Sequence, residues 1–274
     1  MPRGMVLTDL DGTFLNSSGR ISTENLAMLQ RLGDNDIVRV AATGRTLHSS
    51  REVVKHDLPF AYLDFSTGAG ICSFEDDHVI CAHELGRHDI HALSEFFLEC
   101  EVDFSIHHPI PENHRFHWFA APEPSSDLLS RLHYLKEFAT QGPYQQLSRA
   151  TQFLAISTDG LAIIEELQRR FPNLSIIRTT SPIDGRHVWI EVFHPHASKG
   201  LAARWLCEEL GIEQRHTMSI GNDYNDIAML EWTNRGFVVA NGPDDLRKRF
   251  LAAPANDEHG FAIAAEQWLQ ELNR

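Results

Sequence analysis

The chain has 274 residues, enough for one or two domains with a substantial hydrophobic core. Its formal net charge is −14 and its basic residues are scattered, which argues against a nucleic-acid-binding surface, because phosphate backbones attract clustered Lys and Arg. No apolar run is long enough to span a bilayer, and the N-terminus enters the first predicted strand without an apolar signal-peptide region. We therefore expect a cytoplasmic protein that binds neither nucleic acid nor membrane.

The first and last parts of the chain alternate predicted strands with predicted helices. The first part has strands at 5–10, 37–42 and 60–66, with helices at about 22–33 and 46–56. The last part has strands at 216–220 and 236–240, with helices at 199–211, about 225–233, 243–251 and 260–272. This rhythm is typical of parallel pairing, so both parts are expected to join one doubly wound, mostly parallel α/β sheet.

Between these parts the pattern changes to strands that pair without helical crossovers. Strand candidates are 103–107, 115–120, 152–157, 174–179 and 187–192, with helices near 88–100, 125–139 and 160–171. We predict an inserted α/β domain over residues 84–191 and a core made of 1–83 and 192–274.

The first predicted strand ends in two carboxylates, Asp9 and Asp11. The period of two along a strand points both to one side, and Gly12 permits the sharp turn that follows. Two close carboxylates repel, so they need a cation, and Mg²⁺ with oxygen ligands would screen an incoming phosphate while one carboxylate attacks phosphorus. A calcium loop or a plain turn is the alternative, but a calcium loop needs further acidic ligands that do not follow Gly12.

The stretch 9–15 (DLDGTFL) resembles the first motif of the haloacid dehalogenase (HAD) superfamily of aspartate-nucleophile phosphohydrolases. Three further motifs of that superfamily follow in order. They are a strand that ends at Thr43, a lysine that opens a helix at Lys199, and a glycine–acid loop at 221–226 (GNDYND), which resembles the form of the Cof-type branch. Because each lies at a strand end or a helix start, the four together are a specific signal.

The resemblance implies a HAD-like Rossmannoid core, and it makes the inserted domain a type-two cap with hinges near 82–85 and 191–195. Such caps close over small phosphorylated metabolites. The implied activity is that of a Mg²⁺-dependent phosphatase, acting on a sugar-phosphate-like metabolite through an aspartyl-phosphate intermediate. The spacing of the motifs agrees, since only about thirty residues separate Asp11 from Thr43, which leaves room for a crossover helix but not for a domain.

Asp9 is the candidate nucleophile and Asp11 the candidate general acid and base. The resemblance implies that the Asp9 side chain and the Asp11 backbone carbonyl bind Mg²⁺. Backbone amides near Leu10 and Gly12 are expected to hold phosphoryl oxygens.

Thr43 would donate its hydroxyl to the phosphoryl group, with the Gly44 amide beside it, although a helix cap is the plain alternative. Arg45 either contacts substrate or forms a surface ion pair. Lys199 is expected to neutralise the charge shared by Asp9 and the phosphoryl oxygens. A solvated lysine is less favoured there, because a cation is unfavourable at a helix N-terminus.

The fourth motif departs from the commonest family form, which has aspartate where this chain has Asn222. An amide oxygen can still bind the metal but gives up a charge, and Asp223 follows as a possible substitute. Asp226 would support Lys199 or the metal. The candidate metal set is thus Asp9, Asp11, Asn222, Asp223 and Asp226.

Two asparagines complete the candidate site, with Asn225 at the phosphoryl or substrate edge and Asn241 lining it. Two other functions stay open: a phosphotransferase or mutase with the same machinery, and a binding protein that has lost effective metal binding through Asn222. The sequence predicts neither the substrate nor the oligomeric state. Cap residues around 104–119 and the loop 181–187 are candidates for substrate contact.

Overall fold

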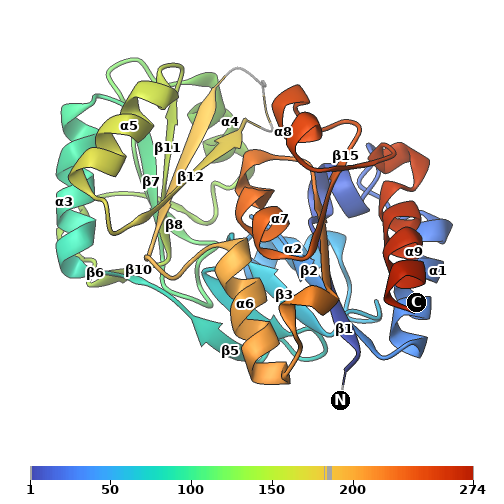
Figure 1. Cartoon of the computed structure of the whole chain (residues 1–274). Coiled ribbons are helices and arrows are strands. Elements are labelled where there is room, and N and C mark those ends of the chain that lie inside the picture. The colour runs from blue at the N-terminus through green and yellow to red at the C-terminus, as the bar shows by residue number, and fades with distance from the viewer. Residues whose placement is uncertain (1, 182, 184–186, 274) are drawn as a thin grey trace. The chain divides into compact units, whose positions relative to one another are not determined.

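The structure, a computed structural model, describes residues 2–181, 183 and 187–273 (Figure 1). Positions 182 and 184–186 of the loop expected to contact substrate therefore lie outside the described residues. The chain forms two compact units. The core unit comprises Met1–Cys81 with Ser198–Arg274, and the inserted unit comprises Ala82–Ala197.

The core unit is built on an eight-stranded sheet with the order β16-β15-β14-β1-β2-β3-β4-β5. All pairings from β16 to β3 are parallel, and β4 runs antiparallel to β3. The predicted mostly parallel α/β fold is thus confirmed. The strands are β1 (Gly4–Thr8), β2 (Ile37–Ala42), β3 (Tyr62–Phe65), β4 (Gly70–Ser73), β5 (Val79–Ala82), β14 (Thr217–Gly221), β15 (Arg235–Val239) and β16 (Leu251–Ala253).

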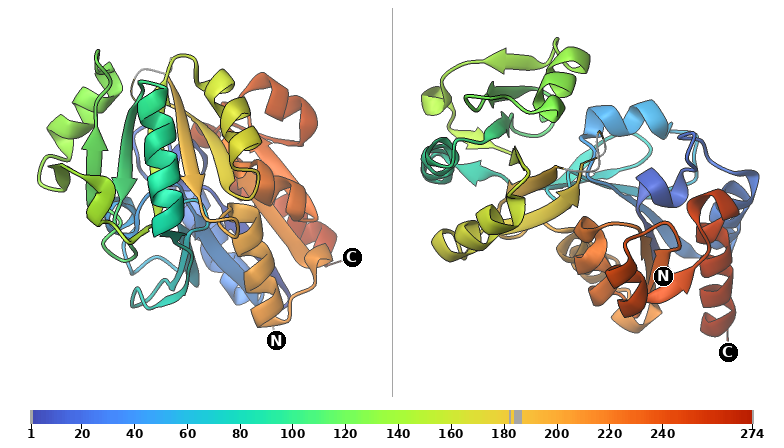
Figure 2. Two further views of the ribbon diagram at one scale, coloured as in Figure 1. Left: turned by 90° about the vertical axis from the view of Figure 1, so that its left-hand side faces the viewer. Right: turned by 90° about the horizontal axis from the view of Figure 1, so that it is seen from above.

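Helices cover both faces of this sheet. On one face α1 (Thr23–Asp34) and α9 (Gly260–Leu272) lie side by side, and on the other lie α6 (Lys199–Leu210) and α7 (Ile227–Trp232) (Figure 2). The remaining helical segments of this unit are short: η1 (Leu10–Phe14), α2 (Leu47–Val53), η3 (Gln214–His216), η4 (Tyr224–Asp226), α8 (Asp244–Arg249) and η5 (Asn256–Glu258).

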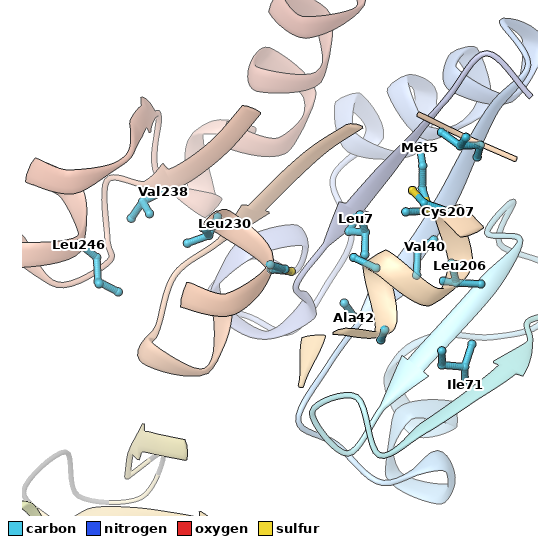
Figure 3. Close-up of a cluster of buried hydrophobic side chains, with 14 residues drawn as sticks. Met5, Leu7, Val40, Ala42, Ile71, Leu206, Cys207, Leu230, Val238 and Leu246 are labelled. Carbon is cyan, nitrogen blue, oxygen red and sulfur yellow. The ribbon is translucent and has the colours of Figure 1, made fainter. Parts of the chain in front are cut away.

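The alternation of side chains along β1 and β2 explains how these layers are held together. Met5, Leu7, Val40 and Ala42 occupy every second position and are fully buried in one cluster with residues of α6 and α7 (Figure 3). Burying a large apolar side chain such as Met5, Leu7 or Val40 stabilises a fold by about 1.5–3 kcal/mol. Strong packing along β1 and β2 therefore fixes the ends of these strands, where the candidate site residues begin.

The inserted unit contains a six-stranded sheet with the order β12-β13-β11-β7-β8-β9 and a separate two-stranded pair, β10-β6. Helices α3 (Arg87–Glu99) and α5 (Gly160–Arg170) supply side chains to its apolar core, which includes Phe97, Phe104 and Phe153. The other elements are β6 (Leu85–Gly86), β7 (Asp103–His107), β8 (Phe116–Phe119), α4 (Ser126–Tyr134), β9 (Ala139–Gln141), η2 (Tyr144–Gln146), β10 (Arg149–Ala150), β11 (Gln152–Ser157), β12 (Ser175–Thr180) and β13 (Val188–Phe193).

The sequence pattern did not predict several short strands. The hairpin β4–β5 was not predicted, because its strands have four residues each and the second is only half-buried. The helix expected at 125–139 ends at Tyr134, where Leu135 leaves the helical conformation. Within the described part of the chain, no helix combines the length and the apolar character needed to cross a membrane.

Candidate active site

The candidate site lies where β1, β2 and β14 end. The parallel registers place Thr8 beside both Ala41 and Ile220, so the segments that follow these strands emerge at one edge of the sheet. The Asp9 backbone N–H continues the pairing by donating to the carbonyl of Ile220 at 3.0 Å. The sheet therefore brings together the loops that carry Asp9, Thr43 and Asn222.

Asp9 belongs to a buried chain of charges. The Lys199 ammonium donates to Asp9 Oδ1 at 2.8 Å and to Asp226 Oδ1 at 2.6 Å. The side chains of Lys199 and Asp226 are fully buried, whereas that of Asp9 is 8% exposed. Asp9 is thus the one of these three charged side chains that a ligand can reach.

Burial also shifts the pKa values of Asp9 and Lys199. It raises the pKa of Asp9 to about 7, against the attraction of Lys199, which lowers it. Burial on its own lowers the pKa of Lys199, but the attraction of Asp226 and Asp9 outweighs it and the pKa of Lys199 rises above its ordinary value. Lys199 therefore stays a cation, and the charge of Asp9 is sensitive to any further cation nearby.

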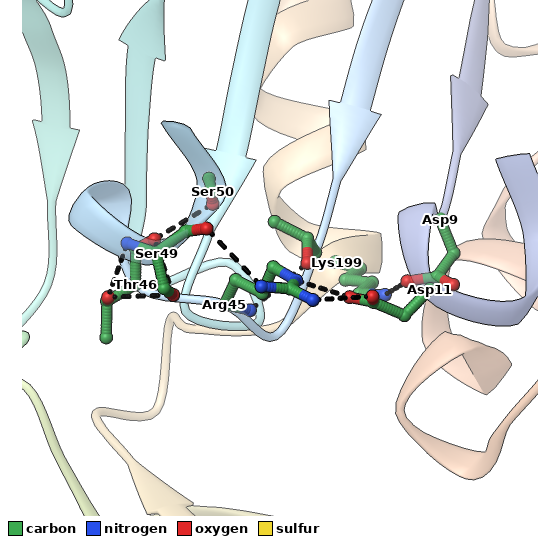
Figure 4. Close-up of polar contacts among 8 residues, drawn as sticks. Asp9, Asp11, Arg45, Thr46, Ser49, Ser50 and Lys199 are labelled. Atoms are coloured by element: carbon green, nitrogen blue, oxygen red, sulfur yellow. Dashed lines mark hydrogen bonds and ion pairs between the residues drawn. The ribbon is translucent and has the colours of Figure 1, made fainter. Parts of the chain in front are cut away.

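Asp11 lies at the solvent-exposed side of the site, where it is paired with Arg45. The Arg45 guanidinium donates from Nε to Asp11 Oδ2 at 2.6 Å and from a terminal nitrogen to Asp11 Oδ1 at 2.8 Å (Figure 4). Hydrogen bonding to Asp11 raises the pKa of Arg45. Of the two expectations for Arg45, the ion pair is the one present in the structure.

A tight turn, η1, follows Asp9. Gly12 has φ = +72°, a left-handed conformation that glycine adopts without steric cost. Asn241 braces this turn, because its Nδ2 donates to the Gly12 carbonyl at 2.8 Å while its Oδ1 accepts from the Asn256 amide at 3.0 Å. Leu10 is fully buried within the turn.

Thr43 and Gly44 form the second side of the site. The Thr43 hydroxyl oxygen accepts from the Arg45 backbone N–H at 3.1 Å, and the threonine is nearly completely buried. A Cβ on Gly44 would lie 3.4 Å from Asn225 Nδ2 and 3.5 Å from Thr67 Oγ1. Asn225 therefore lies next to Gly44.

The loop after β14 holds Asp226 in place through its backbone. Asp226 Oδ2 accepts from the amides of Asn222 at 2.8 Å and Asp223 at 3.0 Å. Both carboxylate oxygens of Asp226 therefore have protein donors, since Oδ1 accepts from Lys199. This arrangement fits a residue that supports Lys199 better than one that binds a metal directly.

Asn222 lies against the carboxylate loop. One arm of its side-chain amide is 3.2 Å from Asp9 Oδ2, from the Asp11 carbonyl oxygen and from Thr13 Oγ1. Ligands on neighbouring vertices of an octahedral Mg²⁺ site are about 3 Å apart, given metal–oxygen distances of 2.0–2.1 Å. The spacing and the oxygen chemistry of Asp9, Asp11 and Asn222 thus fit a hard divalent cation.

No cluster of three or more His, Cys, Asp or Glu side chains in the described part of the chain is arranged as a metal site. A cation at the candidate site would therefore depend on the Asn222 amide and the Asp11 carbonyl as well as on carboxylates.

Two residues near the site were not predicted. Thr13 is fully buried beside Asn222, and Asp64 is a fully buried carboxylic acid at the end of β3. Burial raises the pKa of Asp64 to about 8, against the attraction of Lys199, so it is largely protonated at neutral pH. Its position at the end of a predicted parallel strand was the signal available in the sequence.

Comparison with known proteins identifies the family of this chain. The family model for haloacid dehalogenase-like hydrolases matches residues 6–264. The putative phosphatase YxeH of Bacillus subtilis is 26% identical over 282 residues, covering 96% of this chain and 97% of that protein. The 5-amino-6-(5-phospho-D-ribitylamino)uracil phosphatase YwtE of the same organism is 23% identical over 290 residues, covering 96% and 97%.

A solved structure shares the fold. The HAD phosphatase BT1666 from Bacteroides thetaiotaomicron superposes with a TM-score of 0.80 at 16% sequence identity, covering 97% of this chain and 94% of its own. The family match extends over both units and includes the loops that carry Asp9, Thr43, Lys199 and Asp226. The chain belongs to the haloacid dehalogenase-like hydrolase family.

Proposed function

We propose that this protein is a Mg²⁺-dependent phosphatase that hydrolyses small phosphorylated metabolites through an aspartyl-phosphate on Asp9. The observation that carries the proposal is the buried Asp226–Lys199–Asp9 group, in which Asp9 is the carboxylate that a ligand can reach. A carboxylate nucleophile divides hydrolysis into two easier steps, in which phosphorus is first bonded to Asp9 and then attacked by water.

Asp11 is proposed to move the protons. It would protonate the leaving oxygen in the first step and take a proton from water in the second. Its present partner, Arg45, is a cation that a phosphoryl group can attract, because guanidinium binds phosphate and carboxylate in the same bidentate manner. Substrate binding to Arg45 would thus release the Asp11 carboxyl for proton transfer.

We propose that hydrogen-bond donors around Asp9 hold the phosphoryl oxygens. These are the backbone amides near Leu10 and Gly12, the Thr43 hydroxyl with the Gly44 amide, and Asn225. Lys199 balances the charge that develops on Asp9 and the phosphoryl oxygens. Asn241 acts through the Gly12 carbonyl and keeps the turn in shape.

Asp9, the Asp11 carbonyl and Asn222 are proposed to hold Mg²⁺, with Asp223 close enough in sequence to join them directly or through water. Asp226 is proposed to support this site through Lys199 and the amides of the loop. When bound, the ion would supply two positive charges that lower the pKa of Asp9 and screen the approach of an anionic substrate.

The inserted domain, predicted at 84–191, is proposed to be the cap that selects the substrate. YwtE supports a small phosphorylated metabolite as the substrate, because its name specifies a phosphorylated ribitylamino compound. Differences between relatives in the cap would set which metabolite is used.

The test is phosphate release from p-nitrophenyl phosphate and a panel of sugar phosphates, with and without Mg²⁺. Asp9→Asn removes the nucleophile with little change in shape and is expected to lower kcat by about a thousandfold or more. The control is Asp57→Asn, which removes the same charge at an exposed position and is expected to leave kcat unchanged. Full activity in Asp9→Asn would remove Asp9 from the mechanism.

A further inference from the structure

The side chain of Asn222 contacts groups that differ in whether they can donate or only accept hydrogen bonds. The arm that lies 3.2 Å from Asp9 Oδ2 and from the Asp11 carbonyl oxygen faces two acceptors, and neither of these can donate while Asp9 is ionised. An amide nitrogen in this position donates to both. An amide oxygen in this position would face two other oxygens and be repelled, unless a cation lies between them.

Thr13 can serve either orientation of this amide. Its hydroxyl can donate to an amide oxygen at 3.2 Å, and it can equally accept from an amide nitrogen at the same distance. Thr13 is fully buried, and the amide is a partner for its hydroxyl in both cases. The two ends of an amide have nearly the same shape, and a half-turn about the last side-chain bond exchanges them without any change in packing.

We propose that Asn222 is a reversible amide latch on the cation site. Without a divalent cation its nitrogen donates to Asp9 and to the Asp11 carbonyl, and with one its oxygen turns inward and binds the ion. The inference rests on the Mg²⁺ site of the proposed function, but not on the reaction that occurs there.

The charges around Asn222 explain what the latch achieves. Asp9, Asp11, Asp223 and Asp226 are carboxylates of the same two loops, and Lys199 pairs with Asp9 and Asp226 while Arg45 pairs with Asp11. An aspartate at position 222 would add a carboxylate 3.2 Å from Asp9 Oδ2, with repulsion that a bound cation would relieve. The amide instead supplies hydrogen-bond donors in the absence of the ion. Compared with an aspartate at position 222, the asparagine makes the protein more stable in the absence of Mg²⁺ and lowers its affinity for Mg²⁺.

The test compares the wild type with Asn222→Asp in EDTA and in MgCl₂, without substrate. We expect Asn222→Asp to have a lower Tm than the wild type in EDTA, a larger rise in Tm on addition of MgCl₂, and a Kd for Mg²⁺ lower by about tenfold in calorimetry. The matched control is Asn234→Asp, which adds the same charge at an exposed position and is expected to behave as the wild type.

Asn222→Ala gives a second and independent measurement, because it removes both the donor and the ligand. It is expected to lower the Tm in EDTA and to raise the Kd for Mg²⁺ by about tenfold. In ¹⁵N spectra, the side-chain NH₂ signals missing from Asn222→Ala identify Asn222. In the wild type, these protons are expected to exchange slowly with solvent in EDTA and faster in MgCl₂, as the nitrogen leaves Asp9.

Each outcome bears on the latch separately from the phosphatase assay. Equal responses of Tm and Kd to MgCl₂ in the wild type, Asn222→Asp and Asn222→Ala would overturn the latch, as would NH₂ signals that MgCl₂ leaves unchanged while calorimetry records binding. Absence of Mg²⁺ binding to the wild type would overturn it too. The proposed phosphatase fails on a different result, the absence of phosphate release or its persistence in Asp9→Asn.

Discussion

Lys199 carries a positive charge into the interior of the core unit, where it donates hydrogen bonds to Asp9 and Asp226. Buried charges are tolerated when they are paired, and removing one member leaves the others without compensation. The role proposed for Lys199 at the phosphoryl group and its role in stability therefore depend on the same contacts.

We predict that Lys199→Met lowers the free energy of unfolding by about 3–5 kcal/mol, because Asp226 is left buried without its cation. The measurement is urea-induced unfolding. Lys248→Met, which replaces an exposed lysine, is expected to change the free energy by less than about 0.5 kcal/mol.

The double variant Lys199→Met with Asp226→Asn supplies a further check. Its loss in free energy of unfolding is expected to be smaller than the sum of the losses of the two single variants. The reason is that Asp226→Asn removes the carboxylate that Lys199→Met leaves without a cation. Simple additivity would show that the pair is not energetically coupled.

His107, in the inserted unit, is a buried imidazole held in its neutral form. Its Nδ1 lies 2.8 Å from the Asn113 carbonyl oxygen and is assigned the proton, which leaves Nε2 as an acceptor for Arg131 at 3.4 Å. Burial, and next the repulsion from Arg131, lowers the pKa of His107 to about 3.

We predict that this histidine makes the protein less stable as the pH falls below about 6.5. The unfolded chain then binds a proton that the folded chain does not, so stability is lost from the unfolded pKa of about 6.5 down to the folded value of about 3. At pH 5 the loss is about 2 kcal/mol relative to pH 7.5. Urea unfolding at both values measures it, and His107→Gln is expected to show a smaller difference, whereas an equal difference would contradict this origin.

At the scale of elements, the first turn of α6 is positioned by a close approach to the loop after β3. Gly68 has φ = +89°, and a Cβ at this residue would lie 2.3–2.7 Å from backbone atoms of Ser198, the N-cap of α6. Lys199 is the next residue, so the absence of a side chain at Gly68 permits the position of the buried ammonium.

We predict that Gly68→Ala destabilises the protein by about 3 kcal/mol or more, since it adds a steric clash to the strain of a left-handed conformation. Gly19→Ala is the matched control, because Gly19 also has a positive φ of +69° but has nothing within 4 Å of the added Cβ. It is expected to cost about 1 kcal/mol in the same thermal and urea unfolding experiments. Equal losses would mean that the approach to Ser198 does not constrain α6.

At the scale of the whole molecule, each unit has its own hydrophobic core. One cluster joins β1 and β2 to α6 and α7, and the other joins α3 and α5 to the six-stranded sheet. The two chain segments that enter and leave the inserted unit run side by side, since the rings of His83 and His194 stack with centroids 5.4 Å apart. We therefore expect that a short link can replace the insertion.

We predict that the core unit folds when residues 82–197 are replaced by a short Gly/Ser linker. Circular dichroism and calorimetry are expected to record a single cooperative unfolding transition, because the core cluster contains no residue of the insertion. The full chain is the control. A shortened chain without a cooperative transition would show that the core depends on the inserted unit.

Much of the architecture could be predicted from local pattern. The alternation of apolar runs and helical segments predicted β1, β2, β14 and β15 to within a few residues, because buried parallel strands are continuous apolar runs. The hairpin β4–β5 and the short strands β9, β10 and β16 were missed, since two to four residues carry too little periodicity to be recognised.

The sequence by itself determined the family and the positions of Asp9, Thr43 and Lys199, because a residue that ends a parallel strand or opens a helix has its place fixed by the fold. The tertiary structure alone decided the partners: Arg45 on Asp11, Asp226 on Lys199, and the Asn222 amide between Asp9 and Asp11. The Lys199–Asp9 bond joins residues 190 positions apart. Contacts at such separations depend on how helices and loops pack, which local pattern does not encode.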